Sequence, residues 1–122
     1  MKLGFLSPTN HGIVDYVAAI ALIIGPFILG IGDVNPMARW VSIAAGIVVI
    51  VVSLATRYRY GLLKVLPFGG HLALDLLAAT AFMLVPYLLK LQGLEEAYFY
   101  INAAVVYLVV ALTASESPSN TY

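Results

Sequence analysis

The sequence predicts an all-α membrane protein with four transmembrane helices, arranged as two tandem helical hairpins that form parallel repeats. Three observations predict it: 62% apolar residues with only 10% charged ones, four long apolar runs, and a duplicated polar motif. An ordinary soluble chain carries about a quarter charged residues, because a small domain has a large surface to hydrate. Most of the surface of this chain is therefore expected to contact lipid.

The four apolar runs have the length of membrane-spanning helices, since about 20 residues cross about 30 Å of hydrocarbon. They cover residues 13–31, 40–56, 72–89 and 97–114. The first and third connections are short, so neighbouring helices should be antiparallel. The predicted organisation is a first hairpin over residues 1–60, a second over 61–114, and a disordered cytoplasmic tail over 115–122.

The basic residues predict how the chain is oriented, because cytoplasmic loops hold the excess of Lys and Arg. The side that carries the N-terminus and the central loop has Lys2, Arg57, Arg59 and Lys64, against Arg39 and Lys90 on the other side. We therefore expect a multi-pass protein of the cell membrane with both termini in the cytoplasm. The aromatic residues expected at the outer headgroup layer are Trp40, Tyr87, Tyr98 and Tyr100.

The duplication is visible when each residue is aligned with the residue 60 positions later. The matching polar and special positions are His11 with His71, Asp15 with Asp75, and Pro26 with Pro86. This pattern is specific, because His, Asp and Pro are all disfavoured on lipid-facing helices. The second helices match weakly, with Ser42 over Asn102. Each unit has two spans, so the repeats should be parallel, with helices one and three facing each other across a pseudo-two-fold axis.

The first unit resembles a known family. Gly25-Pro26-Phe27 lies near the outer end of an apolar helix that Asp15 opens, and a second helix contains Ala44-Ala45-Gly46-Ile47-Val48. This arrangement is similar to the SPW-repeat membrane proteins, which carry Ser-Pro-Trp where this chain has Gly25-Pro26-Phe27 and Val85-Pro86-Tyr87. The Pro and a following aromatic residue are kept, while Ser and Trp are absent from both copies. The resemblance implies a fold and little chemistry.

The polar residues inside the spans form the candidate site: His11, Asp15, His71 and Asp75. Residues four apart share one helix face, so each His can hydrogen-bond its own Asp. Both Asp residues lie within about one turn of the predicted helix starts, where the helix dipole favours an anion. The pairs could stabilise the association of the helices, form an ion or proton path, or hold a cofactor. For the last, His11 and His71 are candidate ligands of zinc or haem.

Pro26 and Pro86 each remove a helix hydrogen bond, so they are expected to kink their helices or to end them near the outer face. Small residues, Ala21 with Gly25 and Ala44-Ala45-Gly46, offer surfaces where helices can approach closely.

Composition also excludes several function classes. Zero formal charge argues against nucleic-acid binding, and the absence of cysteine excludes thiolate sites. There is neither a Gly-rich phosphate loop nor a nucleophile elbow, so we expect no enzyme activity and no required cofactor. The leading prediction is a structural or accessory membrane subunit whose partners are the lipid bilayer and a homo-oligomer or larger membrane complex. The alternative predictions are a proton- or cation-conducting protein and a metal- or haem-binding one.

Overall fold

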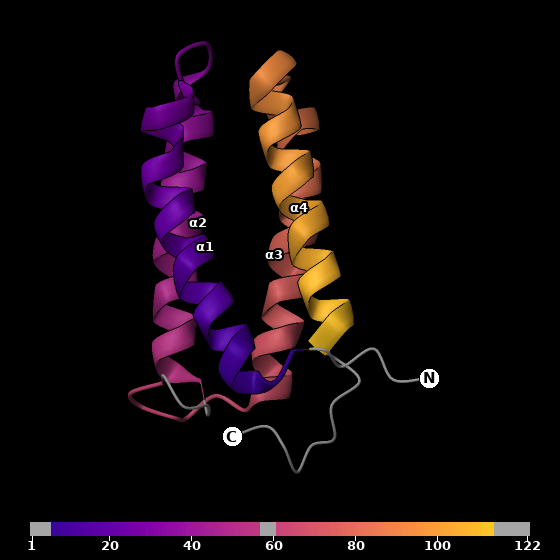
Figure 1. Ribbon diagram of the computed structural model, residues 1–122. Helices are drawn as coiled ribbons and strands as arrows, with labels where there is room; N and C mark the ends of the chain where they lie inside the picture. The colour runs from indigo at the N-terminus through magenta and orange to yellow at the C-terminus, as the bar shows by residue number, and fades with distance from the viewer. Residues whose placement is uncertain (1–5, 57–60, 114–122) are drawn as a thin grey trace.

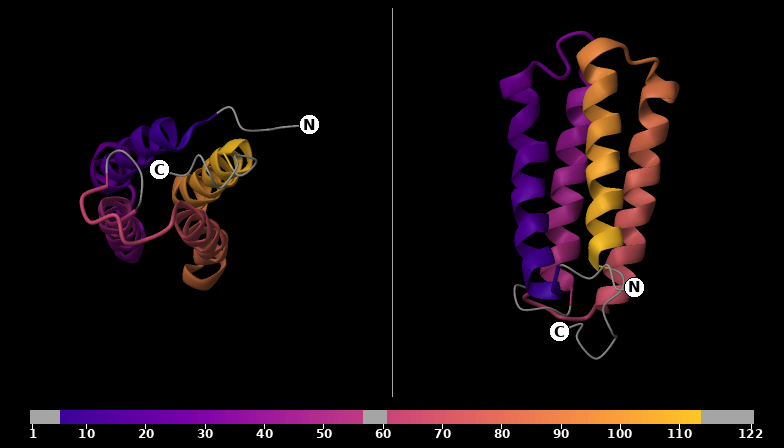
Figure 2. Two further views of the ribbon diagram at one scale, coloured as in Figure 1. Left: turned by 90° about the horizontal axis from the view of Figure 1, so that it is seen from below. Right: turned by 45° about the vertical axis from the view of Figure 1, so that its right-hand side comes forward.

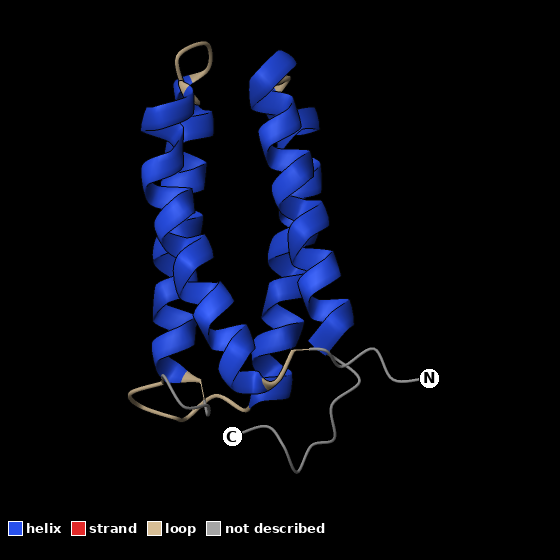
Figure 3. Ribbon diagram, in the orientation of Figure 1, coloured by secondary structure: helices blue, strands red, loops and turns tan. Residues whose placement is uncertain are grey.

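The computed structural model describes residues 6–56 and 61–113 as four α-helices joined by loops. The helices are α1 (Pro8–Leu29), α2 (Pro36–Ala55), α3 (Phe68–Leu89) and α4 (Gly93–Thr113). Within these two ranges no strand occurs (Figure 3). An isolated β-bridge pairs Thr56 with Leu66. The all-α prediction is confirmed. The predicted tail over residues 115–122, like Lys2, Arg57 and Arg59, lies outside the described residues.

All four helices are long and apolar enough to cross a membrane, so this is a multi-pass membrane protein. They begin four or five residues before the predicted apolar runs, because polar caps start the first two of them. The side chain of Ser7 accepts the backbone N–H of Asn10 at 3.1 Å, and the side chain of Asn35 accepts that of Met37 at 3.0 Å. A search for apolar runs misses such polar first turns.

The C-terminal ends of α1 and α3 are built alike. The backbone N–H groups of Ile31 and Leu91 donate to the carbonyls of Pro26 and Pro86, each at 2.9 Å. The cap residues Gly30 and Lys90 adopt left-handed backbone, with φ of 74° and 55°. Both helices therefore end one turn after their proline, where the left-handed cap residue stops the helix.

The helices pack as two hairpins, α1 with α2 and α3 with α4, and both pairs stay side by side in three orientations (Figures 1 and 2). The helices within a hairpin contact each other far more extensively than the two hairpins do. Gly46 permits the close approach of α2 to α1, since a Cβ there would lie 2.8 Å from the carbonyl oxygen of Ala19. The predicted packing role of this small residue is confirmed.

The bundle has two distinct ends. The terminal end carries the starts of α1 and α3 and the ends of α2 and α4, and the hairpin end carries the connections 30–35 and 90–92. An apolar core drawn from all four helices fills the hairpin end; its largest buried members include Leu22, Phe82, Tyr98 and Phe99. Tyr98 was expected at the headgroup layer, but its side chain turns inward to Ser42, at 2.6 Å between the hydroxyl oxygens. The other predicted belt residues, Trp40, Tyr87 and Tyr100, are exposed.

Candidate functional site

The four predicted polar residues meet at the terminal end of the bundle, and we call His11, Asp15, His71 and Asp75 the His–Asp cluster. His11 lies on the first turn of α1 and His71 on the first turn of α3, while Asp15 and Asp75 follow one turn later. Both imidazole rings are fully buried. The Asp15 side chain is 9% exposed and that of Asp75 is 16% exposed. The duplication thus brings its two copies of the motif to one place.

Contacts in the His–Asp cluster run across the hairpins as well as along each helix. Nε2 of His11 lies 3.1 Å from a carboxylate oxygen of its own Asp15 and also 3.1 Å from one of Asp75. Nε2 of His71 lies 2.9 Å from an Asp15 oxygen and 3.3 Å from an Asp75 oxygen. Sequence spacing predicts the pairs along each helix. The cross-hairpin pairs, which are equally close, follow from the predicted facing of helices one and three.

Two threonines that the sequence analysis did not identify hold the other side of each imidazole. Nδ1 of His11 lies 3.1 Å from the Thr113 hydroxyl at the end of α4. Nδ1 of His71 lies 2.8 Å from the Thr56 hydroxyl, directly after α2. Each His thus contacts both helices of the opposite hairpin. The arrangement is reciprocal, because each hairpin supplies one His, one Asp and one Thr.

Thr56 and Thr113 are equivalent in the fold but 57 positions apart, so an alignment by 60 does not pair them. The difference arises in the connections, which cover residues 30–35 in the first hairpin and 90–92 in the second. Three residues are missing from the second connection, and the register of α4 is shifted by the same amount. The predicted pairing of Ser42 with Asn102 is therefore wrong. Asn102 instead donates to the carbonyl of Tyr98 at 2.8 Å, one turn earlier on α4.

Aromatic packing closes the His–Asp cluster. The Phe68 ring lies edge-on to the His11 ring, with centroids 5.3 Å apart, and nearly parallel to the His71 ring at 6.1 Å. Phe68 is the first residue of α3 and is 2% exposed, so it shields the imidazoles. The two imidazoles lie edge to face, 5.4 Å apart, which leaves no room for a porphyrin between them. In this arrangement a haem ligated by both rings does not fit.

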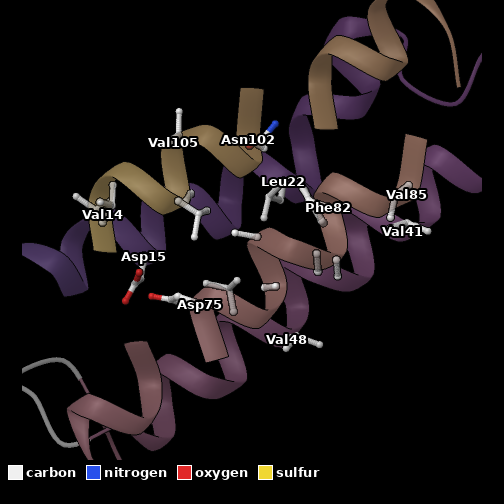
Figure 4. A pocket seen from close by; sticks show the side chains of 18 residues that line it. Val14, Asp15, Leu22, Val41, Val48, Asp75, Phe82, Val85, Asn102 and Val105 are labelled. Carbon is white, nitrogen blue, oxygen red and sulfur yellow. The ribbon is translucent and has the colours of Figure 1, made fainter. Parts of the chain in front are cut away.

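A cavity of about 300 Å³ lies between the hairpins beside the cluster, and Val, Leu, Ala and Phe side chains from all four helices form most of its wall. Asp15 and Asp75 face each other at one end of this cavity (Figure 4). Asn102 is the other polar side chain on the wall. The carboxylates, unlike the imidazoles, thus border this partly open cavity. The Asp residues also lie two turns into α1 and α3, so the helix dipole, which acts within the first turn, contributes less than expected.

A second buried acid, Glu95, joins the hairpins at the hairpin end. Its carboxylate accepts the backbone N–H groups of Gly32 at 2.8 Å, Val34 at 3.2 Å and Asn35 at 3.2 Å. Asn35 in turn donates from its side chain to the carbonyl of Leu89 at 3.2 Å. The sequence does not signal the bonds to Glu95, because an acid near the start of a helix is ordinarily exposed. Glu95 is 4% exposed.

Comparison with known proteins places the chain in a family. A family model described as the SPW repeat domain matches residues 9–116, which includes all four helices and the whole His–Asp cluster. No curated protein and no solved structure matches the chain significantly. The match covers most of the chain, and a proline lies near the C-terminal end of both α1 and α3. The chain therefore belongs to the SPW repeat family.

Proposed function

We propose that this protein is a non-enzymatic structural or accessory membrane subunit in which the His–Asp cluster holds the two helical hairpins together. The observation that carries the proposal is that Nε2 of each His lies as close to the Asp of the other hairpin as to its own. Lipid supplies no hydrophobic drive between helices, so polar contacts of this kind stabilise their association. The hairpins contact each other less extensively than the helices inside each hairpin do, and at the terminal end the His–Asp cluster makes the contact between them.

The test of this proposal compares amide and alanine variants. Asp15→Asn and Asp75→Asn keep a group that can hydrogen-bond the imidazole, and polar pairs between membrane helices contribute only about 0.6 kcal/mol on average. Both variants should fold almost as stably as the parent in detergent. Alanine at either position should loosen the hairpins. Asn variants that fail to fold, or alanine variants that match the parent, would contradict a structural role.

An alternative function is proton or cation conduction, and the observation in its favour is that both cluster carboxylates border the cavity between the hairpins. Its mostly apolar wall does not favour a water-filled path. The same Asn variants separate the two functions. Conduction predicts pH-dependent flux in liposomes that Asp15→Asn or Asp75→Asn abolishes with the fold intact, whereas a structural role predicts no flux in the parent.

The proposed orientation places the terminal end of the bundle in the cytoplasm. Lys64 lies in the loop before α3 at this end, while Arg39 and Lys90 lie at the hairpin end; the sequence adds Lys2, Arg57 and Arg59 to the terminal side. Reporter fusions after Tyr122 and in the loop between α2 and α3 should both read cytoplasmic. A fusion between α1 and α2 should read external. A C-terminal fusion that reads external would contradict this orientation.

The proposed partners are the lipid bilayer and further copies of the chain or a larger membrane complex. Many large apolar side chains point outward along the helices, among them Val17, Ile28, Leu77 and Leu108. They suit contact with either lipid tails or another helix. The mass of the purified protein in detergent, after subtraction of the bound detergent, should distinguish a single chain from an oligomer.

A further inference from the structure

The hydroxyl groups of Thr56 and Thr113 determine which imidazole nitrogen carries the proton. Each hydroxyl donates its one hydrogen to a backbone carbonyl four residues earlier, that of Val52 at 2.6 Å and that of Val109 at 2.8 Å. The hydroxyl oxygen can then only accept from the imidazole. Nδ1 of both His11 and His71 is therefore the N–H donor, and Nε2 is the nitrogen that points at the carboxylates.

This arrangement demands positive charge between the Nε2 atoms and the carboxylates. A neutral imidazole with its hydrogen on Nδ1 presents a lone pair on Nε2, and a carboxylate oxygen also presents lone pairs. Nε2 of His71 lies 2.9 Å from an Asp15 oxygen, a distance at which two lone pairs repel unless a cation lies between them. Two carboxylates balance two units of positive charge. Either two protons or one divalent cation supplies them.

The four groups are close to the spacing of a tetrahedral zinc site. Bonds of about 2.0–2.2 Å to nitrogen and oxygen place tetrahedral ligand atoms about 3.4 Å apart. The four His-to-Asp distances are 3.1, 3.1, 2.9 and 3.3 Å, all within about half an ångström of that value. Asp75 meets both Nε2 atoms with Oδ2, whereas Asp15 meets His11 with Oδ1 and His71 with Oδ2, so the Asp15 carboxylate must turn to present a single oxygen to an ion. One ligand atom from each residue lies within 4.8 Å of the others, so the longest of these separations must shorten by about 1.4 Å to reach tetrahedral spacing.

The surroundings also match those of a metal-ligating histidine. Such a residue normally donates its second ring N–H to a fixed acceptor, which sets the ring orientation. Thr56 and Thr113 provide that acceptor for His71 and His11, and each is itself held by its own helix. The Phe68 ring shields the imidazoles, while the Asp15 and Asp75 side chains stay 9% and 16% exposed. The ligands are thus oriented before any ion binds.

We propose that the His–Asp cluster is a binding site for one zinc ion, with His11 and His71 as ligands through Nε2 and Asp15 and Asp75 through one carboxylate oxygen each. Two imidazoles among the ligands favour a transition metal over Ca²⁺ or Mg²⁺, which prefer oxygen alone. With four protein ligands the coordination is closed, as in structural zinc sites, so the ion stabilises the junction of the hairpins. This goes beyond the structural role proposed above, which needs no metal.

The chain allows a clean binding test, because it contains no cysteine and its two histidines are both in the cluster. The full chain, purified without a histidine tag and stripped with a chelator, is dialysed against Zn²⁺, and bound zinc is measured by mass spectrometry. We expect one zinc ion per chain in the parent. Asp15→Asn, Asp75→Asn and His71→Gln should each lower the affinity by more than about 10-fold.

Glu95→Gln is the matched control, since it removes a buried carboxylate at the hairpin end and leaves the cluster ligands in place; it should bind zinc as the parent does. Thr113→Val keeps all four ligands but removes the acceptor of the His11 N–H. It should keep one zinc ion per chain at an affinity lowered by about 10- to 100-fold.

A second measurement keeps the proposal testable even if some variants fail to fold, because it uses the unaltered chain. Co²⁺ added to the unaltered chain should give the intense visible absorption of a four-coordinate site with nitrogen and oxygen ligands, and Zn²⁺ should remove it. Zinc should also raise the unfolding temperature of the parent and leave that of Asp75→Asn unchanged. Less than stoichiometric zinc in the parent, equal affinity in the parent and the Asn variants, or a six-coordinate Co²⁺ spectrum would overturn the proposal.

Discussion

The two ends of the bundle join the hairpins in different ways. At the terminal end the junction is reciprocal, since each hairpin supplies one His, one Asp and one Thr to the His–Asp cluster and its threonine partners. At the hairpin end one acid, Glu95 of the second hairpin, accepts three backbone N–H groups from the connection of the first. The equivalent residue of α2, 57 positions before Glu95, is Ala38, which has no carboxylate with which to make the same contact.

This difference shows where the internal symmetry of the fold is kept. The terminal end keeps it although α4 is shifted by three residues, because Thr113 still reaches the imidazole that Thr56 reaches in the other hairpin. The hairpin end does not show this internal symmetry, and its two connections differ in length. A junction built from matched side chains of both copies requires specific residues in both copies of the repeat. A junction between a carboxylate and backbone N–H groups requires a specific side chain only at the position of the carboxylate.

The largest effect is expected from His71→Ala, which leaves the two buried carboxylates one cationic or hydrogen-bonding partner short. Removing one partner of a buried ion pair costs about 3–5 kcal/mol, so the free energy of unfolding should fall by about 3 kcal/mol. The measurement is unfolding in mixed micelles, without added metal. A fall below about 1 kcal/mol would show that the terminal end is not the stronger junction.

Glu95→Ala tests the hairpin end and should have the next largest effect. It leaves the N–H groups of Gly32, Val34 and Asn35 without their carboxylate acceptor, and hydrogen bonds to a charged group are worth about 1.5–3 kcal/mol. We expect a loss of about 2 kcal/mol in the same assay. Glu95→Gln, which keeps one acceptor oxygen, should lose less. Equal losses for the two variants would mean that the side chain acts by packing.

Gly46→Ala tests packing inside one hairpin and should have a smaller effect than either junction variant. The added methyl group would lie 2.8 Å from the Ala19 carbonyl oxygen, a backbone atom that cannot move aside. Such overpacking costs about 1–3 kcal/mol, and we expect a value near the lower limit. Ala45→Gly, at the neighbouring position of α2, controls for the general effect of changing a small residue. An unchanged stability would show that α1 and α2 are less closely packed.

The smallest effect is expected from Asp33→Ala, which removes the 2.9 Å ion pair with Arg39 at the hairpin end. The Asp33 side chain is 69% exposed, and exposed pairs contribute about 0.2–1 kcal/mol. Arg39 also keeps its bond to the Ile31 carbonyl at 3.1 Å and its position over the Phe27 ring. The variant should be within about 0.5 kcal/mol of the parent. A larger loss of unfolding free energy would show that this exposed ion pair contributes substantially to the stability of the hairpin end.

Much of the fold could be predicted from the sequence, because apolar length and the duplicated motif are local signals. The cluster residues were found for the same reason: His and Asp are conspicuous in an apolar helix, and the repeat implies that α1 and α3 meet. The threonines escaped notice because Thr is common in helices, and because the shorter second connection moves Thr113 out of the 60-residue register. Glu95 and Tyr98 were missed because their partners lie in the other hairpin, which no local pattern reveals.

The central claim is that His11 of one hairpin and Asp75 of the other stabilise the fold together, and a double-mutant cycle tests it most directly. The free energy of unfolding is measured for the parent, His11→Ala, Asp75→Ala and the double variant, all without added metal. We predict a coupling energy of about 1 kcal/mol or more, above the average of about 0.6 kcal/mol for polar pairs between membrane helices. Additivity within about 0.3 kcal/mol, the behaviour of independent sites, would contradict the claim.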